Sequence, residues 1–507
     1  MANKRRFQFL LLMAVFTIAT CGLIYELIAG ALASYLLGDS VRQFSYTIGT
    51  YMFAMGIGSY FSKFIEKKLL KRFVEIEILI GIVGGISSTL LFLLFQQGSY
   101  FQVVLYFLLG LTGILVGMEI PILMRILKDK VEFRQLVANI FTFDYIGALL
   151  ASILFPVVLV PKLGLISTSI VFGIINIVVG LLLIYLFRKE LKDTFILTFK
   201  SIVAFSGLCI LLFFNKEVLD YSERNLYNGS IVYSHTTPYQ KIVLTNQGAD
   251  FQLYLNNNLQ FDTKDEYRYH ECLVHPVMGF AASVEKVLIL GGGDGLAARE
   301  VLKYDEVKFV TLVDLDEGMT QLFAKNPRLM AYNKQSLTNP KMEVINQDAF
   351  LWVKNNKTKY DVVIIDFPDP TNYSIGKLYT NYFYECLKQS LKSESVVSIQ
   401  TTSPFTAPNA YWCINATISA IYPEVRAYHV YVPSFGEWGF NLFSNDPKQS
   451  FRYVKRRMDN LKFYDYQFES YTDFKKDMLP ASELEINRLD NQVLVRYFEE
   501  DWSKLRE

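Results

Sequence analysis

Residues 285–318 read EKVLILGGGDGLAAREVLKYDEVKFVTLVDLDEG. The apolar run Val287–Leu290 predicts a short, buried parallel strand, and the glycine-rich turn 291–295 follows it directly. Residues 296–304 then predict a helix. Glycines in such a turn let the backbone pass close to a ligand where a Cβ atom would clash.

The next strand is predicted over 308–313, and it ends at Asp314, about 20 positions after the turn, where nucleoside sites place a carboxylate for the ribose hydroxyls. Asp294 stands inside the turn, which does not follow the dinucleotide pattern G-x-G-x-x-G. A carboxylate there repels phosphate and attracts a sulfonium or an ammonium group. The stretch therefore indicates a site for a cationic nucleoside related to S-adenosylmethionine. The alternative is the glycine-rich turn of another α/β enzyme.

The chain divides by composition into two halves. It has 507 residues, of which 51 % are apolar, so it exceeds one ordinary domain. Residues 1–214 hold 18 Lys and Arg against 11 Asp and Glu, and the remainder holds 32 against 38. We expect a membrane domain followed by a soluble domain with no nucleic-acid surface. The five cysteines and four histidines show no disulfide framework and no zinc spacing, so we expect no metal.

Residues 1–214 predict a multi-pass helical membrane domain of six or seven spans, since a span needs about 20 apolar residues. The apolar runs cover residues 7–37, 43–61, 73–95, 101–124, 136–160, 165–187 and 195–214. Lys and Arg cluster at the N-terminus and in every second loop, which indicates that these parts are cytoplasmic.

Seven full crossings would put the soluble half outside the cytoplasm, away from a nucleoside substrate. We therefore expect either a partial last segment over 195–214, which holds Lys200, or another miscounted span. The soluble half is then cytoplasmic and the chain lies in the cell membrane. Glu26, Glu119 and Asp144 lie within apolar runs, where carboxylates mark either a substrate or proton path or structural pairing.

The second half predicts an α/β fold. Residues 215–280 indicate a small β-rich region of hairpins followed by a helix. Residues 281–450 alternate strands and helices, which predicts a mostly parallel, Rossmann-like sheet with helices on both faces. Residues 451–507 predict a helical tail, over 451–461 and 483–502, that serves as a peripheral cap or a dimer contact.

Four carboxylates follow predicted strands in this half: Asp294, Asp314, Asp348 and Asp366. Because ligands bind at the carboxyl ends of parallel strands, we expect the four to meet in one crevice. Taken singly, Asp314 and Asp348 also suit helix N-caps, and Asp369 before a proline suits a turn.

Residues 221–450 resemble the spermidine synthase family, the polyamine aminopropyltransferases, and in part its membrane-fused branch. The motifs that carry the resemblance are TPYQ (237–240), YRYHE (267–271), GGGDG (291–295), VDLDE (313–317), QDA (347–349), DFPDP (366–370), GKLYTNYFYE (376–385) and VPSFGEWGF (432–440).

The resemblance implies a class I methyltransferase-like fold and transfer of the aminopropyl group of decarboxylated S-adenosylmethionine, a co-substrate, to putrescine or a similar amine. No further cofactor is implied. Gln240, Asp314, Asp348 and Ala349 would hold the methylthioadenosine part, and Asp294 would face the aminopropyl ammonium. The family is commonly dimeric, so a homodimer is expected.

The resemblance also implies an amine pocket lined by Tyr269, His270, Asp366 and Asp369, with Asp366 as the proton acceptor. From the residues alone, a core histidine is the favoured interpretation of His270. Trp438 either forms a wall of this pocket or has only a packing role.

The sequence departs from the family at Tyr373, which stands where the family has a proline that contacts the adenine. This departure leaves the geometry of the lid open.

Two other functions fit parts of the pattern. A methyltransferase on the same fold would need contacts for the methionine carboxylate, which Asp294, Asp366 and Asp369 would repel. A membrane transporter with a polyamine-sensing soluble half has support only from the carboxylates inside the apolar runs.

Overall fold

The structure is a computed structural model that describes residues 2–37, 40–94, 99–128, 132–215, 217–218, 227, 229–480 and 482–504. The chain forms two compact units, Met1–Gly229 and Ser230–Glu507. This division falls 15 residues after the predicted end of the membrane domain at 214, and the β-rich region belongs to the second unit.

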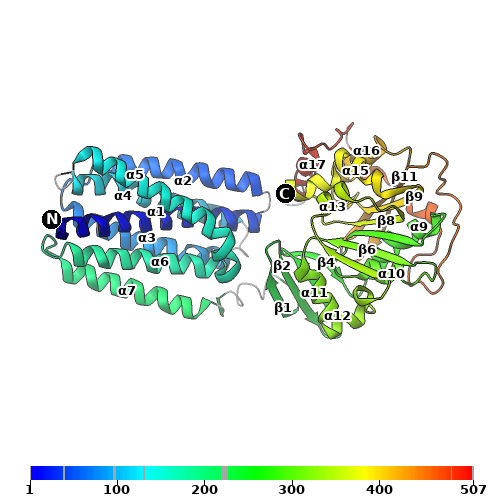
Figure 1. Cartoon of the computed structure of the whole chain (residues 1–507), viewed down its shortest axis with the longest axis horizontal. Coiled ribbons are helices and arrows are strands. Elements are labelled where there is room, and N and C mark those ends of the chain that lie inside the picture. The colour runs from blue at the N-terminus through cyan, green and yellow to red at the C-terminus, as the bar shows by residue number, and fades with distance from the viewer. Residues whose placement is uncertain are drawn as a thin grey trace. The chain divides into compact units, whose positions relative to one another are not determined.

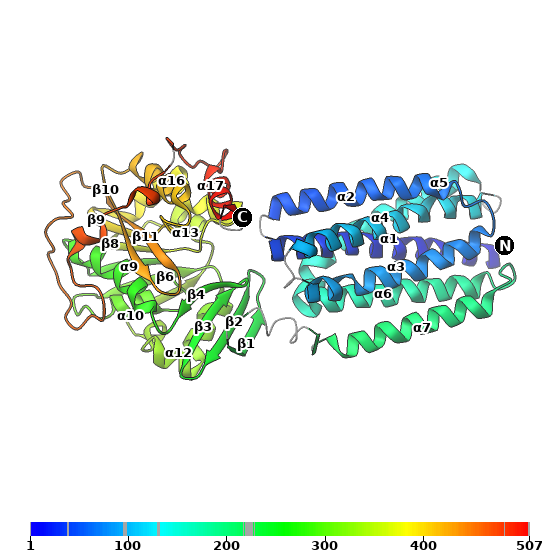
Figure 2. The same cartoon turned by 180° about the vertical axis from the view of Figure 1, so that it is seen from behind.

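The first unit is a bundle of long helices that lie side by side (Figures 1 and 2). Helix α2 packs against α4, α3 against α6, and α1 against α5. Buried leucine, isoleucine and phenylalanine side chains fill its interior. The helices are α1 (Ala2–Leu37), α2 (Ser40–Ser62), α3 (Leu69–Leu94), α4 (Ser99–Leu127), α5 (Phe133–Leu154), the π-helical turn η2 (Phe155–Leu159), α6 (Val160–Leu186) and α7 (Thr194–Phe213).

Within the described residues of this unit, five helical stretches are long and apolar enough to cross a membrane. One of them, Arg134–Leu186, contains both α5 and α6 and bends at Gly164, whose φ is +76°. Helix α7 has 20 residues, a length of about 30 Å, which is that of a full crossing. The structure therefore does not support the partial last segment expected over 195–214.

The second unit contains two sheets. The strands β1 to β4 form an antiparallel sheet in chain order, and the larger sheet has the order β10-β11-β9-β8-β5-β6-β7. Strands β5 to β9 are parallel, while β11 runs antiparallel to both β9 and β10. The strands are β1 (Ser230–Thr236), β2 (Lys241–Gln247), β3 (Asp250–Leu255), β4 (Asn258–Asp262), β5 (Lys286–Gly291), β6 (Phe309–Asp314), β7 (Met342–Asn346), β8 (Tyr360–Asp366), β9 (Leu391–Gln400), β10 (Glu424–Val432) and β11 (Gly436–Ser444).

Helices cover both faces of the large sheet (Figure 1). The apolar side chains of its central strands belong alternately to two buried clusters. This is the predicted Rossmann-like architecture. The helices of this unit are α9 (Glu266–Phe280), α10 (Leu296–Val301), α11 (Glu317–Lys325), α12 (Pro327–Tyr332), η3 (Ser336–Thr338), α13 (Ala349–Asn355), α14 (Tyr373–Gly376), η4 (Lys377–Tyr379), α15 (Asn381–Leu387), η5 (Lys388–Ser390), α16 (Pro408–Ser419), η6 (Phe468–Tyr471), η7 (Lys476–Met478) and α17 (Val493–Ser503).

The prediction of a helical tail over 451–507 is wrong for most of its length. Across residues 451–480 and 482–504, α17 is the only α-helix. The carboxylate of Glu271 accepts hydrogen bonds from the backbone N–H groups of residues 462–464, at 2.8–3.0 Å. The N–H groups of residues 455 and 456 donate to the carbonyl of Gly279. Because tertiary partners take these donors, the segment forms no helical ladder.

Candidate active site

The crevice lies where the chain order of the large sheet reverses. Strand β5 has β6 on one side and β8 on the other. The connections after β5 and β8 leave in opposite directions, and such a switch point opens a crevice at the carboxyl ends of the strands. Gly291, at the end of β5, pairs with Asp366, at the end of β8. The glycine turn and Asp366 therefore share the crevice.

The glycine turn passes directly against two carboxylate-bearing residues. Gly291 has a φ of +83°, and a Cβ atom there would lie 2.1 Å from the carbonyl oxygen of Asp366. A Cβ atom on Gly293 would lie 2.8 Å from Cγ of Asp314. Any larger residue at these positions would displace the site, which gives the glycines their physical reason.

Asp314 lies at the end of β6 with its carboxylate on the glycine turn. It accepts hydrogen bonds from the backbone N–H of Gly293 at 3.1 Å and of Asp316 at 2.9 Å. Burial raises the pKa of Asp314 to about 6, although the two N–H groups oppose the rise. The N-cap alternative for Asp314 is wrong, because Asp316 caps α11 by accepting from the N–H of Gly318 at 3.0 Å.

Gln240 reaches this region from the loop between β1 and β2. Its Nε2 donates to Oδ2 of Asp316 at 2.9 Å, and the hydroxyl of Thr237 donates to the same oxygen at 2.8 Å. The buried Asp316 therefore joins the small sheet to the edge of the crevice beside Asp314. Sequence reasoning missed Asp316 as a site residue, although it is the second acid of the VDLDE motif.

Asp348 is an N-cap, as the alternative expectation stated. Its Oδ1 accepts from the N–H groups of Phe350 and Leu351, and its Oδ2 lies 2.7 Å from Nζ of Lys377. Burial alone would raise the pKa of Asp348, but Lys377 and the two N–H groups outweigh it and lower that pKa. The buried Ala349 begins α13.

Asp294 is the acid of the glycine turn, and it is 9 % exposed. Its Oδ1 accepts from the N–H of Leu296 at 2.8 Å, which fixes the start of α10. Burial raises the pKa of Asp294, and the charge of His270 opposes the rise. Asp294 also raises the pKa of Asp366 and of Asp314 electrostatically, so it lies within electrostatic reach of both carboxylates.

Tyr269, on α9, donates its hydroxyl to Oδ1 of Asp366 at 2.5 Å. Burial raises the pKa of Asp366 to about 6, while His270 lowers it and Asp294 raises it further. The tyrosine ring contacts the ring of Trp438 at a centroid distance of 6.4 Å and that of Phe440 at 5.3 Å. Asp366 is thus hydrogen-bonded to a tyrosine whose ring lies among other aromatic rings.

His270 is buried and charged. Its Nδ1 donates to Oε2 of Glu266, one helical turn earlier, at 2.6 Å. Burial alone would lower the pKa of His270, but Glu266 outweighs it and raises that pKa to about 9. Glu266 also binds Arg299 through both of its oxygens, each at 3.0 Å. The histidine is therefore both a core residue and a positive charge beside Asp294 and Asp366.

Asp369 follows β8 by three residues and has a buried oxygen, Oδ1, without a hydrogen-bond partner. Burial raises its pKa to about 7, and the neighbouring Thr402 and Gln400 oppose the rise. Thr402 has a φ of +64°, a rare conformation for a β-branched residue that marks functional sites. Gln400 and Thr402 were missed by sequence reasoning, since only the end of β9 brings them to the crevice.

The structure thus places Asp294 within electrostatic reach of Asp314 and Asp366, and Asp366 and Asp369 within reach of Tyr269 on α9. Asp348 follows the neighbouring strand and is held by its own ion pair. Tyr373 begins α14 and is 45 % exposed.

Comparisons with known proteins show the family to which the chain is similar. The family described as "Spermine/spermidine synthase domain" matches residues 266–454. The chain is 48 % identical over 499 residues to a polyamine aminopropyltransferase of Leptospira interrogans, which covers 98 % of this chain and 99 % of the relative. It is 46 % identical over 507 residues to polyamine aminopropyltransferase 2 of Ralstonia nicotianae, covering 97 % and 98 %.

Among solved structures, spermidine synthase from Thermotoga maritima matches with a TM-score of 0.45 and 27 % identity, covering 49 % of this chain and 87 % of that one.

Proposed function

Since the chain belongs to the polyamine aminopropyltransferase family, we propose that it moves the aminopropyl group of decarboxylated S-adenosylmethionine to putrescine or a similar amine. The products are spermidine and methylthioadenosine. The observation that carries the proposal is the hydrogen bond of Tyr269 to Asp366 within a group of buried carboxylates. Such a group attracts a sulfonium and an ammonium and repels the carboxylate that a methyl donor would bring.

The donor nucleoside occupies the β6 side of the crevice. Asp314 accepts hydrogen bonds from the ribose hydroxyls, for which its position against Gly293 suits it. Gln240 and Ala349 border the nucleoside, and Asp348 accepts from the adenine amino group. The last role requires that Asp348 share its carboxylate between Lys377 and the adenine.

The aminopropyl ammonium of the donor pairs with Asp294. The acceptor amine lies along Tyr269 and Trp438, with its two nitrogens near Asp366 and Asp369. The positive charge of His270 lowers the pKa of Asp366, which favours the ionised carboxylate at neutral pH.

The reaction needs a proton removed from the acceptor nitrogen, and that nitrogen aligned with the carbon next to the sulfonium. The acceptor nitrogen gives a proton to the Asp366 carboxylate, and its lone pair attacks the carbon next to the sulfonium. A C–N bond forms, the C–S bond breaks, and the sulfur leaves as a neutral thioether. Raising the pKa of Asp366 from 3.8 to about 6 lowers the cost of proton transfer by about 3 kcal/mol. Alignment of the acceptor nitrogen with the reacting carbon supplies the rest of the lowering of the activation barrier.

The test measures methylthioadenosine release by full-length protein in detergent, supplied with putrescine and decarboxylated S-adenosylmethionine. Asp366→Asn is expected to lower kcat by about 10²–10⁴-fold, as loss of a general base does. Asp305→Asn, an exposed aspartate after α10, is the matched control and is expected to retain full activity. Release that is unchanged by Asp366→Asn, or methyl transfer from S-adenosylmethionine, would contradict the proposal. A panel of amines then identifies the acceptor.

The proposal includes a place in the cell. We put the helical unit in the cell membrane in contact with lipid, with exposed α7 side chains such as Phe195 and Phe199 outward. The second unit is on the cytoplasmic side, where the donor nucleoside is made. A C-terminal fluorescent-protein fusion should be bright, and an alkaline-phosphatase fusion inactive; the reverse result would overturn the orientation. A homodimer is expected and is checked by sedimentation.

A further inference from the structure

Lys377 lies against the carboxylate to which the proposed function assigns the adenine. Its Nζ is 2.7 Å from Oδ2 of Asp348, while Oδ1 of Asp348 accepts from the backbone N–H groups of Phe350 and Leu351. The side chain of Lys377 is 31 % exposed and that of Asp348 is 26 % exposed, so a molecule in the solvent can reach both. An ammonium has three N–H donors, and the ion pair uses one of them.

Buried contacts fix the backbone on both sides of Lys377. Nδ2 of Asn487, which is 0 % exposed, donates to the carbonyls of Gly376 and Tyr379, at 3.1 Å each. The buried Tyr379 donates its hydroxyl to the carbonyl of Pro368 at 3.0 Å, on the segment that follows β8. The turn η4 is therefore held to the core, and the side chain of Lys377 starts from a fixed backbone. A donor placed in this way loses less entropy when it binds a ligand.

The ammonium and the carboxylate form a donor and an acceptor side by side. Nζ of Lys377 also lies 5.5 Å from the centroid of the Phe350 ring, within the range of a cation–π contact. Burial alone would raise the pKa of Asp348, but Lys377 and the backbone N–H groups lower it. The carboxylate therefore stays ionised and only accepts, while the ammonium only donates. The carboxamide of Asn or Gln presents the same combination when it reads the amino group and N7 of adenine.

Adenine carries the complementary groups. Its amino group donates, and the ring nitrogens on either side of that group, N1 and N7, accept. A base whose amino group donates to Oδ2 of Asp348 brings one of these nitrogens to the ammonium on the same oxygen. Apolar side chains for the faces of the base follow the neighbouring strands: Leu315 after β6 is 42 % exposed, and Tyr373 after β8 is 45 % exposed.

We propose that Lys377 reads the base of the donor nucleoside, by donating a hydrogen bond to a ring nitrogen next to the amino group that Asp348 accepts. This role rests on the proposed function, which assigns the adenine to Asp348. The ion pair is shared with the base and is not broken. A base with a carbonyl oxygen in place of the amino group presents an acceptor to Asp348, so the pair rejects it.

The experiment measures nucleoside binding without turnover. Full-length protein in detergent is studied by equilibrium dialysis with 5′-methylthioadenosine and with its 1-deaza and 7-deaza analogues, in which a C–H group replaces one ring nitrogen. One of the two analogues is expected to bind the wild-type protein about 10- to 100-fold more weakly, as loss of a hydrogen bond from a charged donor does. In Lys377→Met, the same analogue should bind within about threefold of methylthioadenosine. Because each ratio compares two ligands on one protein, other effects of the substitution cancel.

Lys388→Met is the matched control. Lys388 is 33 % exposed, and its Nζ lies 3.1 Å from the Glu385 carboxylate and 5.7 Å from the centroid of the Tyr422 ring. The substitution therefore removes the same kinds of contact before β9, at the opposite edge of the sheet, and should keep the wild-type ratio. Should Lys377→Met fail to fold, judged by gel filtration, Lys377→Leu replaces it with the same expectation.

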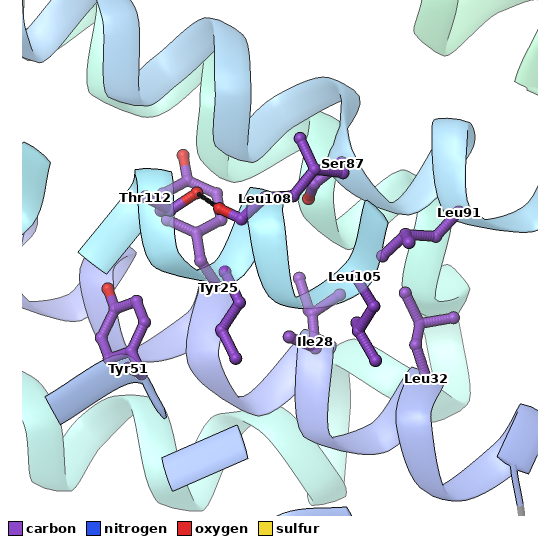
Figure 3. Close-up of a pocket in the computed structure, with 11 residues that line it drawn as sticks. Tyr25, Ile28, Leu32, Tyr51, Ser87, Leu91, Leu105, Leu108 and Thr112 are labelled. Atoms are coloured by element: carbon purple, nitrogen blue, oxygen red, sulfur yellow. Dashed lines mark hydrogen bonds between the residues drawn. The ribbon is translucent and has the colours of Figure 1, made fainter. Parts of the chain in front are cut away.

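Nucleoside binding is not expected in the cavity of the helical unit. This cavity, bordered by Tyr25, Tyr51 and Thr112 (Figure 3), has a volume of about 10 Å³, room for about one water molecule. Asp314→Asn checks that the ligands bind in the crevice. It should weaken binding of all three nucleosides by about 10-fold and leave the ratios unchanged, because Asp314 contacts the ribose and not the base.

The outcomes separate this role from the proposed function. An equal loss with each analogue in the wild-type protein and in Lys377→Met, or no loss with either analogue, would overturn the role of Lys377. Unchanged binding in Asp314→Asn would overturn it too, since the ligands would then lie elsewhere. In each of these cases, release of methylthioadenosine in the transfer assay would still support the proposed function. A protein that neither binds methylthioadenosine nor releases it would refute the proposed function, and this role with it.

Discussion

The pair of Glu266 and His270 gives a sharp test of the electrostatics of the crevice. Both side chains are buried, at 2 % and 3 % exposed, and Nδ1 of His270 lies 2.6 Å from the Glu266 carboxylate. Glu266→Gln keeps the shape of the side chain and removes its charge. Burial of the ring would then dominate, and the pKa of His270 should fall from about 9 to below its ordinary 6.5.

The magnitude follows from linkage. A histidine whose pKa is raised from 6.5 to about 9 on folding contributes about 3 kcal/mol of stability. This stability is complete below pH 6.5 and is lost as the pH rises through 9. The wild-type protein should therefore lose stability between pH 6.5 and 9. Glu266→Gln should lack that slope and should be less stable by about 3–5 kcal/mol at pH 6.5, because it also leaves Arg299 underpaired.

The assay is thermal unfolding of the full-length protein in detergent, followed by tryptophan fluorescence from pH 6 to 9.5. The signal reports only the second unit, since all four tryptophans, Trp352, Trp412, Trp438 and Trp502, lie in it. A loss of 3 kcal/mol should lower Tm by about 6–12 °C.

Glu285→Gln is the matched control for this assay. It breaks an exposed ion pair with Lys308 and should cost no more than about 1 kcal/mol. If Glu266→Gln has the same Tm as the wild-type protein from pH 6 to 9.5, or shows the same dependence of Tm on pH, the reasoning is refuted.

Three further outcomes are expected. The kcat/KM of the transfer reaction should be lost about tenfold per pH unit below pH 6, because Asp366, with its pKa of about 6, must be ionised. A flat profile from pH 5 to 7 would exclude Asp366 as the base. Gly293→Ala should raise the KM for the donor about 10-fold or more, since its Cβ would lie 2.8 Å from Cγ of Asp314, and kinetics at saturating amine check this. Glu271→Gln should make residues 455–471 accessible to trypsin, because the Glu271 carboxylate accepts three backbone N–H groups of this segment. An unchanged digestion pattern would show that other contacts hold the segment.

Local patterns predicted the centre of the second unit. The apolar run before the glycine turn becomes β5, and the acids at 314 and 366 end β6 and β8. These features depend on residues within a few positions of each other, and parallel strands always bring their carboxyl ends to one edge. The convergence of Asp294, Asp314 and Asp366 could therefore be expected from the chain order alone. The apolar runs of the first half predicted its helices for the same reason.

Partners distant in the chain decided the rest. The charge of His270 depends on Glu266 one turn away, but Glu266 is held ionised by Arg299, 33 residues later. The helical pattern over 451–461 loses to the carbonyl of Gly279 on α9, which accepts from the N–H groups of residues 455 and 456, because a backbone N–H bonded to a tertiary partner is not available to the helix. The sequence by itself determined the elements and the edge of the sheet where the acids gather; the tertiary structure determined which of the acids are charged, since protonation depends on burial and on partners that no local pattern contains.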